Sequence, residues 1–167
     1  MDKNDLLILK MIEYDKGNPW MIQHLIKVHE FSRLIGLKEG LDEETMQILE
    51  VSAIVHDIGI KAAREKYGQS NGKLQEKEGP PIAEKMLEEI GYDKKVIERV
   101  CYLVAHHHTY TDIDNIDYQI LVEADFLVNL YEENSSMEAV KSTYEKIFRT
   151  ASGREICRKI FGFESVY

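Results

Sequence analysis

Cysteine is scarce in this sequence of 167 residues: only Cys101 and Cys157 occur, far apart in the chain. Because no Cys-x-x-Cys spacing is present, neither a disulfide framework nor a zinc knuckle is expected. Cys101 lies in the apolar run Val100-Cys101-Tyr102-Leu103, so we expect it to belong to the core.

Long hydrophobic runs are also absent. No apolar stretch approaches the roughly 20 residues that a transmembrane helix requires. The first residues, Met1 to Asp5, are polar and acidic, which is not the pattern of a signal peptide. We therefore expect a cytoplasmic protein that does not associate with membranes.

Positive charge is in short supply, since 21 lysines and arginines face 30 aspartates and glutamates, for a net charge of −9. An acidic surface repels the phosphate backbone, which disfavours a polymeric nucleic acid as partner. A small phosphate ester is still compatible, because a bound divalent cation reverses the local field. The chain length suits one domain, residues 1–167, with its own core.

Helical periodicity, by contrast, runs through nearly every long segment. Helix caps and helix-breaking residues delimit the predicted helices. In the first part of the chain we expect helices at 5–14, from Asn18-Pro19 to Gly36 or Gly40, and from Asp42 to His56-Asp57. In the second part we expect helices from Pro80-Pro81 to Gly91, from Asp93 to His106-His107-His108, around 120–128, and from a Ser135–Glu138 capping box towards a break at Gly153. The polar, glycine-rich segment 67–79 is expected to be an exposed, mobile loop. The prediction is an all-α, single-domain bundle of about six to eight helices.

Ligand-type side chains stand at inward positions of several of these helices. His56 and Asp57 are adjacent at the end of an apolar run, His24 lies on an apolar helix face, and Asp125 belongs to an apolar stripe. Burying an imidazole beside a carboxylate is unfavourable by several kcal/mol unless both are paired or coordinated. A divalent metal would supply that compensation and, with an open coordination position, a hydrolytic site.

Each of these residues alone has an ordinary explanation. His24 could be a core histidine, Asp125 a buried helix cap, and His56-Asp57 a chance dipeptide. His29 lies roughly 140° round the helix from His24, so we expect it to be structural or at the surface.

Taken together and in this order, His24, His56-Asp57-Ile58-Gly59, His106-His107 and Asp125 resemble the pattern of the HD-domain metal-dependent phosphohydrolases. The stretch Ala53 to Gly59 resembles the HDIG form of that family. The resemblance covers about residues 20–130 and leaves 132–167 as a C-terminal helical extension. The tails, 1–18 and 132–167, are expected to pack on the bundle or at a homodimer interface.

The resemblance implies one divalent metal (Mn, Fe, Co, Ni or Zn) held by His24, His56, Asp57 and Asp125. It also implies attack of a metal-activated water on a phosphate ester or phosphoanhydride of a small molecule, by analogy a nucleotide. Asp57 would orient or deprotonate that water. Lys61 and Arg64 would neutralise the phosphate, unless they only form a solvated helix face.

A second metal or the substrate phosphate is the expected partner of His106 and His107, unless the histidine run simply favours a helix C-terminus. Two-metal members of the family supply a further histidine between the His-Asp pair and this run. No histidine occurs between Asp57 and His106 in this chain, and Gln75 or Glu78 lies in the corresponding region. Of these two, only Glu78 would bind a cation well. One metal is therefore expected rather than two.

Two other functions compete with the phosphohydrolase. A di-iron oxygenase is one, and the missing histidine argues against it. A non-catalytic metal-binding module is the other, and the presence of all four ligands argues against it.

Overall fold

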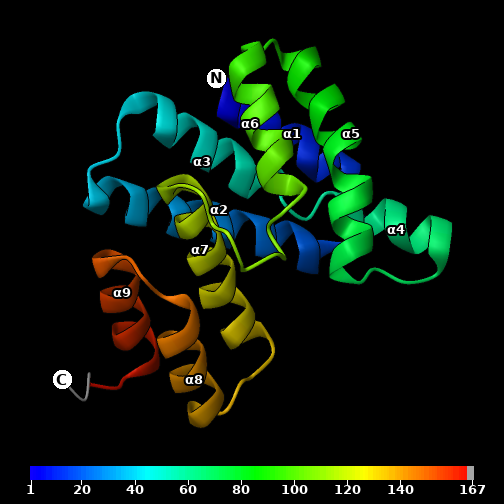
Figure 1. The fold of residues 1–167 in the computed structure, drawn as a ribbon. Helices are drawn as coiled ribbons and strands as arrows, with labels where there is room; N and C mark the ends of the chain where they lie inside the picture. The colour runs from blue at the N-terminus through cyan, green and yellow to red at the C-terminus, as the bar shows by residue number, and fades with distance from the viewer. Residues whose placement is uncertain (165–167) are drawn as a thin grey trace.

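The computed structural model describes residues 1–164, and these form nine helices and no strand (Figure 1). The helices are α1 (Lys3–Tyr14), α2 (Pro19–Glu39), α3 (Glu43–Val55), α4 (Gly59–Tyr67), α5 (Gly72–Ile90), α6 (Lys94–Val104), α7 (Ile116–Glu132), α8 (Met137–Ile147) and α9 (Ala151–Phe161). The predicted all-α class is confirmed. Of the expected C-terminal extension, residues 165–167 lie outside the described part.

The predicted starts of the two helices that carry the first candidate ligands agree with the structure. The Asn18 side chain accepts a hydrogen bond from Met21 N at 3.2 Å, directly before α2. The Asp42 side chain accepts one from Thr45 N at 2.9 Å and so caps α3. Gly40 ends α2 in the left-handed conformation, φ 74°, which glycine adopts without strain.

The prediction of a loop over 67–79 and of a helix start at Pro80-Pro81 is wrong. Helix α4 continues to Tyr67, and α5 begins at Gly72, where the Asn71 side chain accepts a hydrogen bond from Leu74 N at 3.1 Å. Both prolines therefore lie inside α5. An interior proline is unfavourable by about 3 kcal/mol, so the packing of α5 against α4 and α6 outweighs the local signal.

The cap predicted for the next-to-last helix is one residue off, and the break predicted at Gly153 is wrong. The Ser136 side chain, not that of Ser135, accepts the hydrogen bond from Ala139 N. Gly153 lies in the first turn of α9, where a Cβ atom would come within 1.9 Å of the Glu123 carboxylate. Here glycine serves close packing rather than termination.

The arrangement in Figure 1 places α2, α3 and α7 at the centre of the bundle. Helix α1 packs on α3 and α5, and α6 packs on α3 and α5, to one side of this centre. Helices α8 and α9 pack on α7, and α9 also on α2, at the other side. The described parts of both tails therefore pack on the bundle. No helix of the described residues is long and apolar enough to cross a membrane.

A close crossing of α4 and α5 fixes the region beside the His-Asp pair. A Cβ atom on Gly59 would lie 2.5 Å from the Gln75 carbonyl oxygen and 2.7 Å from Gly79 N. The backbones of α4 and α5 therefore approach closely at Gly59. It brings Gln75 towards the end of α6.

Candidate metal centre

Four buried side chains converge where α2, α3 and α7 meet. His24 Nε2 lies 3.4 Å from Asp57 Oδ2 and 3.2 Å from Asp125 Oδ1. His56 Nε2 lies 3.6 Å and 3.5 Å from the same two oxygens. All four residues are at most 8 % exposed. Two imidazole nitrogens and two carboxylate oxygens within one such group can hold a metal ion.

The orientation of both imidazoles leaves the same nitrogen free at the centre. His24 Nδ1 is 2.8 Å from Glu132 Oε2, and His56 Nδ1 is 2.9 Å from the Ala53 carbonyl oxygen. With Nδ1–H donating outward, Nε2 is in each case the nitrogen that a metal would bind once its proton has left. Both Nε2 atoms are buried and have no hydrogen-bond partner. Unpartnered buried nitrogens of this kind are what a bound cation would satisfy.

The charges within the four-residue group indicate that a metal would replace protons bound to the imidazoles. Burial lowers the pKa of His24, but the carboxylates of Asp125 and Asp57 outweigh burial and raise that pKa to about 11. Burial raises the pKa of Asp57, but the imidazoles around it hold the pKa well below its usual range. Without metal, protons on the imidazoles therefore balance the carboxylates, and a cation would displace them.

A second group shares Asp57 with the first. Asp57 Oδ1 lies 3.0 Å from His107 Nε2 and 3.8 Å from His108 Nε2. Gln75 Oε1 lies 2.6 Å from His108 Nε2. Burial and His107 lower the pKa of His108 to about 4, so this imidazole is neutral near pH 7 and can act as a ligand. Asp57 thus points one oxygen at each group.

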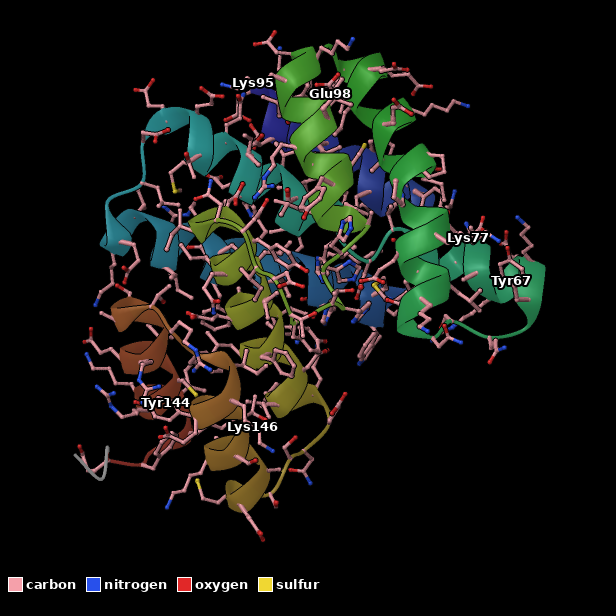
Figure 2. The ribbon with its side chains drawn as sticks, viewed as in Figure 1. Tyr67, Lys77, Lys95, Glu98, Tyr144 and Lys146 are labelled. Carbon is pink, nitrogen blue, oxygen red and sulfur yellow. The ribbon has the colours of Figure 1, made fainter. Side chains whose placement is uncertain are left out.

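Two residues expected at this second position lie elsewhere. The His106 ring stacks on Tyr102 with centroids 4.2 Å apart, and its Nδ1 is 2.7 Å from the Tyr102 carbonyl oxygen. Glu78 accepts hydrogen bonds from Tyr67 and Lys66, at the outer end of α4 where Figure 2 labels Tyr67. The helical turn between His106 and His108 directs His107 and His108 inward instead.

The two cations expected to bind phosphate do not contact the four-residue group. Lys61 Nζ donates to the Tyr14 carbonyl oxygen at 2.7 Å, and Arg64 Nε donates to Ser70 Oγ at 3.1 Å. Lys61 lies near Asp15, a buried carboxylate. Burial raises the pKa of Asp15 to about 6, although the charge of Lys61 opposes this shift.

Glu132 and Asn129 also contact the ligand group, and neither is among the residues expected there from the sequence. Glu132 accepts from His24 Nδ1 and pairs with Lys27 Nζ at 2.6 Å, while Asn129 donates to Asp125 Oδ1 at 2.9 Å. They follow Asp125 by about one and two turns of α7, so they share its face. This helical spacing was the available signal. His29, as expected, lies apart from the group, with Nε2 3.1 Å from Glu50 Oε2.

The family model described as HD domain matches residues 21–141, which is most of the chain and includes every residue of the four-ligand group. No curated protein and no solved structure matches the chain. The family match and the buried histidine–aspartate group agree with each other, and the chain belongs to the HD-domain family.

Proposed function

We propose that this protein is a metal-dependent phosphohydrolase that cleaves a phosphate ester or phosphoanhydride of a small molecule, in the first place a nucleotide. The observation that carries the proposal is the pair of buried, unpartnered Nε2 atoms of His24 and His56 facing two carboxylates. A divalent metal bound there would lower the pKa of a water and withdraw charge from a phosphoryl oxygen. HD-domain proteins are mostly metal-dependent hydrolases, which supports this reading.

The residues have separate roles in this proposal. His24, His56, Asp125 and one oxygen of Asp57 would hold the metal. The second oxygen of Asp57 would orient the attacking water or accept a proton from it. His107 and His108 face that second oxygen from the opposite side, so they can contact the substrate phosphate or a second cation. Arg64 stays at the surface as a candidate phosphate contact, whereas Lys61 is engaged by Tyr14.

The direct test is metal content and phosphate release measured on the same preparations. We expect about one Mn²⁺, Fe²⁺, Co²⁺, Ni²⁺ or Zn²⁺ per chain, and metal-dependent release of phosphate from at least one nucleotide or small phosphate ester. His24→Ala should lose both the metal and the activity. His29→Ala is the matched control, because it removes an imidazole from the same helix without touching the group, and it should change neither. Full metal occupancy in His24→Ala would contradict the assignment.

A di-iron oxygenase is the second candidate, because Asp57 faces two ligand groups at once. Two irons per chain with oxygen consumption, and no phosphate release, would favour it. Absence of any metal after reconstitution would instead favour a non-catalytic module.

A further inference from the structure

Trp20 is the only tryptophan of the sequence, and it is exposed next to the metal centre. It lies in the first turn of α2, where its ring stacks on that of His24 with centroids 5.5 Å apart and planes 15° from parallel. The side chain is nevertheless 54 % exposed. A large aromatic surface held open to solvent beside a ligand suggests a binding surface.

Trp20 forms part of a groove of about 600 Å³ between the first half of α2 and the end of α7. This volume is within the range of small-molecule sites. The side chains that line it include Trp20, Gln23, Lys27, Tyr131, Glu132 and Asn134.

The groove has the chemistry that recognises a planar heterocycle. Tyr131 is 70 % exposed and provides a second aromatic ring. Lys27 Nζ lies over this ring, 5.6 Å from its centroid. Gln23 and Asn134 add amides, which can both donate and accept hydrogen bonds. Proteins commonly bind an unpaired nucleobase by stacking aromatic side chains on its faces and hydrogen-bonding its edge with polar side chains.

The negative charge at the groove is already compensated. Glu132 is the one carboxylate that lines it, and its oxygens contact His24 Nδ1 at 2.8 Å and Lys27 Nζ at 2.6 Å. The groove therefore does not repel the phosphate of a nucleotide as the acidic surface of the chain does.

His24 lies between two groove residues, Trp20 and Glu132, and the aspartates of the metal centre. Trp20 covers the face of its ring and Glu132 contacts its Nδ1 atom, whereas its Nε2 atom faces the two aspartates. The groove and the ligand group are therefore neighbours, separated by the imidazole ring of His24.

We propose that this groove binds the base of a nucleotide substrate, which stacks on Trp20 and Tyr131 while its phosphate lies at the metal centre. This inference rests on the proposed function for the phosphate, but base binding can be measured without turnover.

The first test titrates adenosine into the full chain and follows tryptophan fluorescence, which reports on Trp20 alone. We expect saturable quenching by adenosine and none by ribose. Tyr131→Ala should weaken adenosine binding about tenfold, as loss of one stacking partner does. Tyr102→Ala is the matched control, since Tyr102 is an exposed tyrosine on α6 away from the groove, and it should leave adenosine binding unchanged.

The second test compares the hydrolysis of AMP with that of ribose 5-phosphate. Tyr131→Ala should raise KM for AMP about tenfold, leave kcat within a few-fold, and leave ribose 5-phosphate unaffected. Trp20→Phe should retain most of the preference for AMP, whereas Trp20→Ala should lose it with unchanged metal content.

The outcomes separate the two proposals. Absence of saturable quenching by adenosine, or quenching that Tyr131→Ala does not alter, would overturn the base site even if phosphate esters are hydrolysed. Saturable, Tyr131-dependent quenching without hydrolysis of any phosphate ester would support the groove and overturn the proposed reaction.

Discussion

Each imidazole that faces Asp57 or Asp125 from the first ligand group has its Nδ1 atom fixed by an acceptor outside the centre. For His24 that acceptor is the Glu132 carboxylate, and for His56 it is the Ala53 carbonyl oxygen. A carboxylate partner raises the basicity of a ligand imidazole more than a neutral carbonyl does. His24 is therefore the ligand whose strength depends most on a single side chain.

The substitution Glu132→Gln tests this dependence at the residue scale. It keeps the size of the side chain but removes the charge that faces His24 Nδ1, so we expect metal affinity to fall by about 10- to 100-fold. Competition with a chromophoric chelator would measure the change in Kd. Glu133→Gln, at the next and exposed position, should leave Kd as it is. Equal affinities in both variants would show that Glu132 acts only on packing.

At the scale of elements, the crossing of α4 and α5 joins the His-Asp turn to Gln75. It depends on Gly59, because the atoms nearest to an added Cβ belong to the backbone and cannot rotate away. Packing also explains why Pro80 and Pro81 do not end α5. The contacts of α5 with α4 and α6 maintain the helix where the prolines remove backbone hydrogen bonds.

We expect Gly59→Ala to reduce the free energy of unfolding by about 1–3 kcal/mol, the usual effect of overpacking. The midpoint of urea unfolding, followed by circular dichroism, would measure it. Glu65→Ala, an exposed position of the same helix, should shift stability by no more than about 0.5 kcal/mol. If the two variants unfold at the same midpoint, α4 and α5 can separate without loss.

The sequence predicted helices well where the signal was local. Asn18 and Asp42 cap the helices expected of them, since a cap needs only the next few residues. It failed at Pro80 and at Gly153, where contacts from distant helices decide.

For the candidate site too, the residues with a sequence pattern were predicted and those placed by distant contacts were not. His24, His56, Asp57 and Asp125 come together as expected, because their order and spacing are a family pattern. The positions of Gln75 and His108 depend on how α5 crosses α4 and α6, which no local pattern specifies.

At the scale of the whole molecule, metal binding should be coupled to proton release. The metal-free protein carries a proton on His24 at neutral pH, because the pKa of that imidazole is raised to about 11. Coordination requires the unprotonated Nε2, so binding at pH 7 releases this proton, and affinity should rise with pH. Between pH 6 and 8 we expect Kd to fall roughly tenfold per pH unit for each proton released. Calorimetry in buffers of different ionisation enthalpy would count the protons; a value of zero would contradict the protonated metal-free state.

The ligand group also ties together parts of the chain that are remote in sequence. His24 and the Glu132 that supports it are 108 residues apart, and His107 and Asp57 are 50 apart. A cation held between such segments closes long loops, and closing long loops restricts the unfolded chain most. Metal binding would thus stabilise the folded state, and the metal-free protein would unfold and be degraded sooner. Metal supply would then govern how long each molecule survives as well as what it can do.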